Sequence, residues 1–220
     1  MRKMNKYTVV KISMVIVLST VSMWAGFKLS SILDSGDAQP PIIEGTILKP
    51  ARALTPFKLI DQRRHDFKLE QFKNKWSLVF FGYTNCPDVC PNTLAILKQS
   101  YIDMKVLKME LPQVVFVSVD SKRDEPEILG DYVYYFDPDF VGVTGKKNQI
   151  DNIAKQLSTV YLKAAGSSGD INKDDYLYDH SAAILLINPK AQLQAVFTAP
   201  HNKLGLVDGL QKTMAFYNNQ

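Results

Sequence analysis

Apolar residues are distributed along this chain in two ways. Between residues 12 and 27 they form one almost continuous run, whereas from Pro50 onwards they fall into short runs and periodic segments. The runs Trp76–Phe81 and Val114–Val119 are almost entirely apolar, which is typical of strands buried on both faces. Between them, Asn92–Met109 carries apolar residues at helical spacing. The pattern therefore predicts a strand–helix–strand unit at the centre of a domain.

The remaining pattern predicts further strands and helices around this unit. Hairpins are expected where two strand-like runs flank a short turn, and helices where apolar residues recur every three or four positions. These rules predict hairpins at 57–69 and 181–197, a short strand at 160–162, helices at 125–135, 148–157 and 203–217, and a turn at 142–145. This order predicts an α/β fold: a thioredoxin-like central mixed β-sheet flanked by helices, with an N-terminal transmembrane anchor.

The N-terminal apolar run is the basis for the anchor. Together with Thr8–Lys11 it reaches 20 residues, about the length that crosses a bilayer. Basic residues cluster before it, so the positive-inside rule predicts a single-pass protein with a cytoplasmic N-terminus. A cleaved signal peptide is the alternative, but no small-residue cleavage site follows the run. We therefore expect a cytoplasmic tip and transmembrane anchor at 1–28, a linker at 29–49, and the domain at 50–220.

Charge and cysteine content exclude several classes of protein. The formal net charge is +4, but residues 1–28 hold five basic residues and no acidic one. The remaining 21 basic and 22 acidic residues leave the body near neutral, so no nucleic-acid partner is expected. Two cysteines allow at most one disulfide, too few for a disulfide-stapled secreted domain. The pair is therefore expected to bind metal or to perform redox chemistry.

Both cysteines lie in Cys86–Pro91, between the first buried strand and the helix that follows it. Proline suits the first helical turn, and we place Cys90 at about the N-cap and Cys86 just outside the helix. The unpaired N–H groups and the dipole at a helix N-terminus favour thiolates. The spacing of four leaves room for an ion between the sulfurs, although a disulfide remains possible.

A third ligand would discriminate between these possibilities, because two sulfurs alone under-coordinate most metals. His180 precedes the strand expected at 181–187, whose start faces the cysteine helix in this layout, and Asp179 or a nearby carbonyl could orient its ring. A half-buried histidine bonded to a strand end is an equally good interpretation. We expect His65 to be a solvated turn residue and His201 to lie at a helix N-terminus, neither of them a ligand.

Two cysteines and one histidine form a donor set that suits Cu(I) and can also hold Cu(II), whereas zinc requires a fourth ligand. Redox chemistry of Cys86 and Cys90 stays open as the competing interpretation. Nearby polar and aromatic positions receive structural interpretations. We interpret Asp120 and Asp124 as helix caps, and the tyrosines at 132, 134 and 135 as core or rim positions.

Several segments resemble the signature of the Sco/SenC copper chaperones. They lie within Pro50–Tyr217 and are Phe81–Pro91, Val117–Asp120 with Arg123–Pro126, Phe136–Pro138, Val141–Gly145 and Asp179–Ala182. The resemblance implies a membrane-tethered thioredoxin fold, involved in cytochrome c oxidase assembly, that binds one copper ion through Cys86, Cys90 and His180.

The resemblance also implies partners and a location. It implies delivery of copper to the dinuclear copper centre of cytochrome c oxidase subunit II, or work with its assembly factors, and a periplasmic thiol reductant that keeps the dithiol reduced. The short N-terminal segment looks bacterial, so the domain is expected in the periplasm, tethered to the inner (cytoplasmic) membrane. Such a protein is primarily a binding protein. The alternative is a periplasmic thiol–disulfide oxidoreductase that reduces partner cysteines, and a thiol peroxidase is a weaker third hypothesis.

Overall fold

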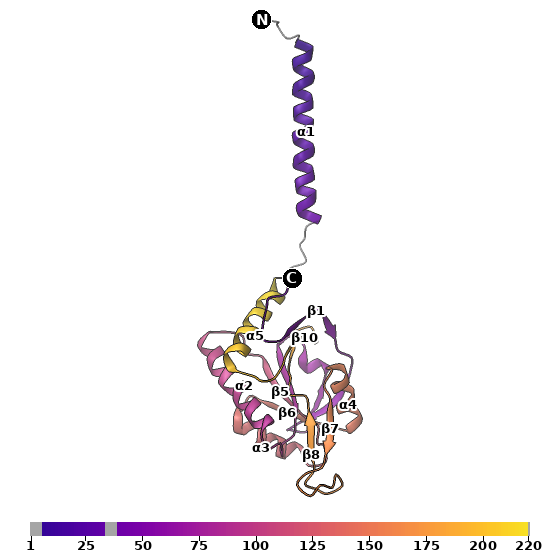
Figure 1. Ribbon diagram of the computed structural model, residues 1–220, viewed down its shortest axis with the longest axis vertical. Helices are drawn as coiled ribbons and strands as arrows, with labels where there is room; N and C mark the ends of the chain where they lie inside the picture. The colour runs from indigo at the N-terminus through magenta and orange to yellow at the C-terminus, as the bar shows by residue number, and fades with distance from the viewer. Residues whose placement is uncertain (1–5, 34–38, 220) are drawn as a thin grey trace. The chain divides into compact units, whose positions relative to one another are not determined.

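The computed structural model describes residues 6–33 and 39–219, and the chain divides into two compact units between Gln39 and Pro40 (Figure 1). The described part of the first unit contains the helix α1 (Lys6–Leu33), whose side chains from Met14 to Lys28 are exposed. Across the described ranges, no helix combines the length and the apolar character that a membrane crossing requires. The anchor expected at 1–28 therefore remains a prediction, and its first five residues lie outside the described ranges.

The linker expected at 29–49 is wrong at both ends. Its first residues belong to α1, residues 34–38 lie outside the described ranges, and its last residues belong to β1 (Thr46–Ala53). β1 contains Pro50, and proline cannot donate to a sheet ladder. However, β1 is an edge strand whose register against its neighbour shifts around Pro50, and such positions tolerate proline.

Within residues 39–219, an eight-stranded mixed sheet has the order β1-β10-β9-β4-β5-β6-β2-β3. Its strands besides β1 are β2 (Lys58–Asp61), β3 (Asp66–Lys68), β4 (Ser77–Gly82), β5 (Gln113–Ser118), β6 (Val141–Thr144), β9 (Ile184–Ile187) and β10 (Gln192–Phe197). β4, β5 and β6 run parallel, whereas β9 pairs antiparallel with β4. Both hairpins expected in this sheet are confirmed, β2 with β3 and β9 with β10.

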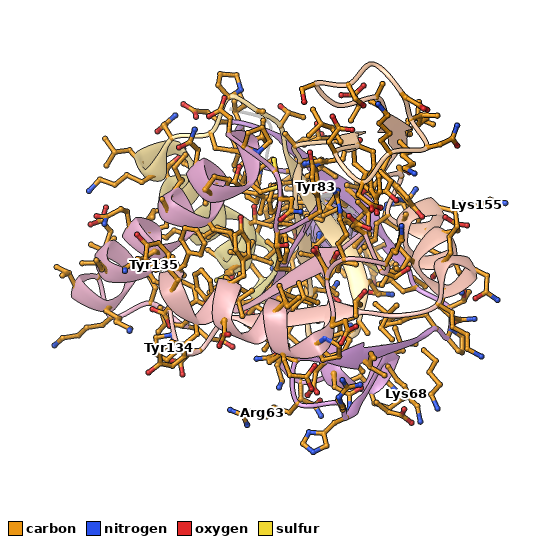
Figure 2. All side chains as sticks on the ribbon, turned by 90° about the horizontal axis from the view of Figure 1, so that it is seen from below. Arg63, Lys68, Tyr83, Tyr134, Tyr135 and Lys155 are labelled. Atoms are coloured by element: carbon orange, nitrogen blue, oxygen red, sulfur yellow. The ribbon has the colours of Figure 1, made fainter. Side chains whose placement is uncertain are left out.

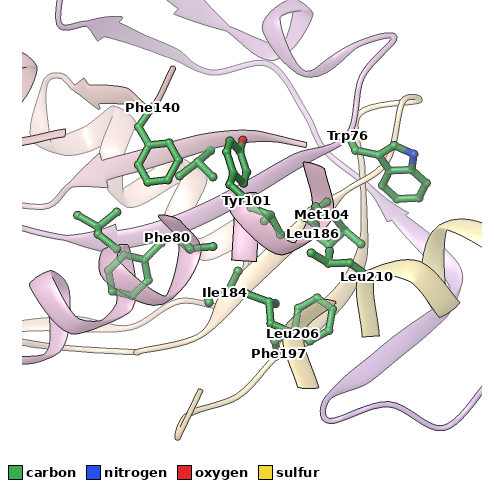
Figure 3. Close-up of a cluster of buried hydrophobic side chains, with 14 of the residues drawn as sticks. Trp76, Phe80, Tyr101, Met104, Phe140, Ile184, Leu186, Phe197, Leu206 and Leu210 are labelled. Atoms are coloured by element: carbon green, nitrogen blue, oxygen red, sulfur yellow. The ribbon is translucent and has the colours of Figure 1, made fainter. Parts of the chain in front are cut away.

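Helices cover both faces of the sheet (Figure 1). They are α2 (Val89–Val106), α3 (Pro126–Phe136) and α5 (Lys203–Asn218) on one face and α4 (Lys147–Gln156) on the other, with a short 3-10 helix η1 (Leu69–Phe72) after β3. Successive residues of β4 point to opposite faces. Phe80 packs under α2, α3 and α5 (Figure 3), whereas Val79 and Phe81 pack on the α4 side. The predicted thioredoxin-like α/β fold is therefore confirmed.

Two local predictions on the α3 side are wrong. The turn expected at 142–145 is largely strand β6, where Gly142 allows α3 to pack closely: a Cβ atom there would lie 3.2 Å from Leu129 Cβ. The glycine that looked like a turn signal is thus a packing requirement. Asp124 does not cap α3, which begins after Glu125 without a side-chain cap. The carboxylate of Asp124 instead accepts hydrogen bonds from the loop that carries the cysteines.

The strand expected at 181–187 begins only at Ile184. The residues before it form β8 (Leu177–His180), which pairs with β7 (Tyr161–Ala164) in a separate two-stranded sheet. Ser181 ends this hairpin, because its N–H donates to the carbonyl oxygen of Val160 and its Oγ accepts from the N–H of Val160. The chain therefore leaves one sheet and enters the other just after His180.

Candidate metal centre

The cysteine loop starts where β4 ends at Gly82 and finishes where α2 begins at Val89. Asp88 is the N-cap, so Cys86 lies outside the helix and Cys90 is the second helical residue. The Cys86 side chain is half-buried, and that of Cys90 is buried. The expectation for Cys86 is confirmed, whereas Cys90 lies two residues further into the helix than the N-cap position expected for it. The helix can include it because Pro91, in the first turn, needs no intrahelical N–H bond.

His180 reaches the cysteines from the end of β8. Its Nε2 atom lies 3.3 Å from Cys90 Sγ, and its Nδ1 atom lies 3.2 Å from the carbonyl oxygen of Ser181. A carbonyl oxygen only accepts, so Nδ1 carries the proton and the lone pair of Nε2 points toward the sulfur. Of the two orienting groups anticipated from the sequence, the backbone carbonyl fills the role. The rings of Phe80 and Tyr83 pack edgewise on the imidazole.

The structure brings the three predicted site residues together. The sulfur atoms of Cys86 and Cys90 and a ring nitrogen of His180 all lie within 4.8 Å of one another. The other two histidines lie elsewhere, as expected. The His65 side chain is 75% exposed beside Asp61, and His201 Nε2 lies 2.6 Å from the carbonyl oxygen of Ala182, just before α5.

The two sulfurs share one proton unequally. A hydrogen bond from the Cys90 thiol lowers the pKa of Cys86 to about 4, and the Cys90 N–H, 3.4 Å away, also favours the thiolate. The same hydrogen bond, together with burial, raises the pKa of Cys90. The half-exposed Cys86 is therefore the thiolate, and the buried Cys90 keeps its proton. The thiolate is the form that binds metal and the form that attacks in thiol exchange, so Cys86 is prepared for either chemistry.

Gly82 makes the space for the buried sulfur, and the sequence interpretation missed it. A Cβ atom at this position would lie 2.5 Å from Cys90 Sγ and 2.7 Å from Phe116 Cε2. Both distances are too short for any side chain. The signal available in the sequence was a glycine at the end of an apolar strand, directly before the cysteine loop.

A buried carboxylate holds the cysteine loop from behind. Asp124 Oδ2 accepts hydrogen bonds from the Thr84 N–H at 2.9 Å and from Ser118 Oγ at 2.6 Å, and its Oδ1 accepts from Thr84 Oγ1 at 2.6 Å. Burial raises the pKa of Asp124, while these hydrogen bonds favour its charged form. Asp124 therefore fixes the loop two residues before Cys86 to the end of β5.

A second buried pair holds the segment that leads to His180. Asp120 is fully buried; it forms an ion pair with Arg123 and accepts a hydrogen bond from the Tyr176 hydroxyl at 2.8 Å. The guanidinium of Arg123 lies 3.7 Å from the centre of the Tyr176 ring and donates to the carbonyl oxygen of Asp174 at 3.0 Å. Asp120 is thus no helix cap. It ties the β7–β8 hairpin to the end of β5.

Comparison with known proteins gives consistent matches. The family model described as SCO1/SenC matches residues 46–215. A SCO2-like protein of Rickettsia prowazekii is 35% identical over 149 residues, which cover 64% of this chain and 67% of the relative.

Among solved structures, ScoI of Arabidopsis thaliana with copper bound superposes with a TM-score of 0.69 at 30% identity, over 74% of this chain and 98% of that one. Yeast Sco1 with copper bound gives a TM-score of 0.65 at 27% identity, over 73% and 87% of the two chains.

Proposed function

This chain belongs to the SCO1/SenC family, and we propose that it is a copper-binding metallochaperone that uses Cys86, Cys90 and His180 as its ligands. Sco proteins are cytochrome c oxidase assembly proteins. The proposed recipient is therefore the dinuclear copper centre of cytochrome c oxidase subunit II, reached directly or through assembly factors, with a periplasmic thiol reductant that keeps Cys86 and Cys90 reduced.

The observation that carries the proposal is the convergence of two sulfurs and one imidazole nitrogen within 4.8 Å. Soft thiolates with an imidazole select copper, and a three-ligand set leaves zinc without its usual fourth ligand. The lone pair of His180 Nε2 already faces Cys90. Two structural relatives with copper bound share the fold and 27% to 30% of the sequence.

Metal analysis of the reduced full-length chain tests this proposal. We expect one copper ion per chain, with two sulfur ligands and one nitrogen ligand by X-ray absorption. His180→Ala removes the nitrogen and should weaken copper retention by about 10–100-fold. His65→Ala is the matched control, because that side chain is 75% exposed beside Asp61 and belongs to the β2–β3 turn. Equal copper retention in His180→Ala and the unaltered chain would remove His180 from the proposed site.

A second function, thiol–disulfide oxidoreductase, is favoured by the lowered pKa of Cys86, about 4, beside a second free thiol. In this reaction the Cys86 thiolate attacks a partner disulfide and releases one partner thiolate. The Cys90 thiol, as it loses its proton, then displaces the other, leaving a Cys86–Cys90 disulfide and a reduced partner. The test is exchange with a model disulfide peptide in the presence of a metal chelator. Exchange that requires copper contradicts this second function.

The proposal includes a location at the inner membrane, with the domain in the periplasm. It is supported by five basic residues and no acidic one in 1–28, most of them before the apolar run. Fractionation of bacterial cells that express the full-length chain tests it. We expect the chain in the membrane fraction, with its C-terminal domain open to protease added to spheroplasts. Recovery in a soluble fraction would contradict the tether.

A further inference from the structure

Tyr132 carries a buried hydroxyl group that the proposed site does not use. Its oxygen is inaccessible to solvent and has no hydrogen-bond partner in the part of the chain that the structure describes. A buried donor without a partner is destabilising, so most buried hydroxyls are paired. Such a hydroxyl is suited to donate a hydrogen bond to an acceptor that is present only in another state of the protein.

One aromatic ring, that of Phe116, connects the Tyr132 ring to the surroundings of the Cys90 sulfur. The Tyr132 ring packs on the Phe116 ring with 5.5 Å between the two ring centroids. The Phe116 ring and Cys90 Sγ both lie next to the position that a Cβ atom of Gly82 would occupy. Tyr132 and Cys86 pack against the same core cluster, which contains Cys90. Burial raises the pKa of Tyr132, and the sulfurs of Cys90 and Cys86 raise it further whenever they carry negative charge. The sulfurs therefore act on this hydroxyl electrostatically even though neither bonds to it.

The neighbouring tyrosines of α3 differ from Tyr132. Tyr134 and Tyr135 are 69% and 79% exposed, and Figure 2 shows both on the outer side of the helix, whereas Tyr83 of the cysteine loop lies among packed side chains. The sequence interpretation treated the α3 tyrosines alike, as core or rim positions. The structure separates one tyrosine with a buried hydroxyl from two tyrosines that are exposed to solvent.

We propose that the Tyr132 hydroxyl is a positioning group of the metal centre, which donates a hydrogen bond to a sulfur ligand when metal is bound. The inference rests on the proposed function, because it requires that Cys86 and Cys90 bind a metal ion. A metal-bound cysteine is a thiolate, and ionised acceptors form the stronger hydrogen bonds. Hydrogen bonds to metal ligands orient them and increase metal retention.

The variant Tyr132→Phe tests the inference in the full-length chain, with Tyr134→Phe and Tyr135→Phe as controls. Reduced chains are titrated with Cu(I) against a competing chelator of known affinity, and with Cu(II) by the thiolate-to-copper absorption band. We expect Tyr132→Phe to bind Cu(I) about tenfold more weakly, as the loss of about 1.4 kcal/mol implies, and to shift the absorption band. The controls should match the unaltered chain in both measurements.

Chemical unfolding of the metal-free chains distinguishes a positioning role from a purely structural one. If the hydroxyl only stabilised the fold, its removal would lower the unfolding midpoint. Because the hydroxyl has no partner among residues 6–33 and 39–219 of the metal-free chain, Tyr132→Phe should unfold at the same or a higher denaturant concentration than the unaltered chain. A lower midpoint, or copper binding and absorption equal to those of the unaltered chain, overturns the inference alone. If the unaltered chain itself binds no copper, the proposed function fails and the inference fails with it.

Discussion

The Nε2 atom of His180 lies 3.3 Å from the Sγ atom of Cys90, although 90 residues separate them in the chain. Cys90 is held by the first turn of α2 and the core beneath it, whereas His180 comes from a hairpin outside the main sheet. The distance between them therefore depends on two conditions. The sulfur needs space beside Gly82, and the hairpin needs to stay fixed to the end of β5.

Gly82→Ala should disturb the first condition. The added methyl group would meet Cys90 Sγ and the Phe116 ring at less than normal contact distances, so the sulfur must move. Overpacking of this kind costs about 1–3 kcal/mol of unfolding free energy, and copper retention should fall as well. Denaturant unfolding and Cu(I) competition measure the two effects.

Gly130→Ala is the matched control for that substitution. A Cβ atom at Gly130, inside α3, lies 3.4 Å from Gln62 Cβ, an ordinary contact. Because alanine is the better helix former, this variant should be neutral or stabilised by up to about 1 kcal/mol. If both glycine variants retain copper equally well, the space beside Gly82 is not a requirement of the site.

Arg123→Gln should disturb the second condition. Asp120 is buried, and removal of its cationic partner leaves an uncompensated carboxylate, which costs about 3–5 kcal/mol for a buried pair. The adjacent Lys122 forms an exposed ion pair with Asp174, so Lys122→Gln should cost about 1 kcal/mol or less. Unfolding midpoints compare the two variants, and equal losses would show that the Asp120–Arg123 pair does not hold the hairpin.

Much of this arrangement could be predicted from the chain itself. The runs at 76–81 and 114–119 are buried parallel strands because no polar residue faces solvent on either side. Cys86, at the front of the helix after the first of these strands, follows from the same order. His180 could be placed near the cysteines only through the layout as a whole, because nothing local marks a histidine as a neighbour of a distant sulfur.

The errors have a common physical cause. Gly142 was interpreted from its local turn propensity and Gly82 was missed, but each of these positions, like that of Pro50, is determined by a tertiary contact or by its place in the sheet. Gly82 accommodates a sulfur, Gly142 accommodates α3, and Pro50 lies in an edge strand. Asp124 resembled a helix cap because it precedes a helix, whereas its partners come from segments that only the fold brings near.

Thr84→Val should loosen the cysteine loop while it preserves the shape of the side chain. It removes the hydroxyl that donates to Asp124 Oδ1 at 2.6 Å and leaves that buried oxygen without this partner, at a cost of about 1–3 kcal/mol. Thr84→Ser keeps the hydroxyl and should retain most of the stability and copper binding. Unfolding curves and Cu(I) competition test both variants, and a serine variant as weak as the valine variant would contradict a role for the hydroxyl.

The pH dependence of the thiols should follow the hydrogen bond between them. The rate of Cys86 alkylation in the reduced, metal-free chain should stay level as pH falls from 8 and decline only near the folded pKa of about 4. The folded pKa lies below the ordinary 9.0, so the unfolded chain binds more protons between these values. The contribution of Cys86 to stability is therefore complete above pH 9 and is lost as pH falls toward 4.

Cys90→Ala removes the main cause of the lowered Cys86 pKa and should move the midpoint of the alkylation profile to higher pH. An unaltered chain with its midpoint near 9 would contradict the thiolate assignment.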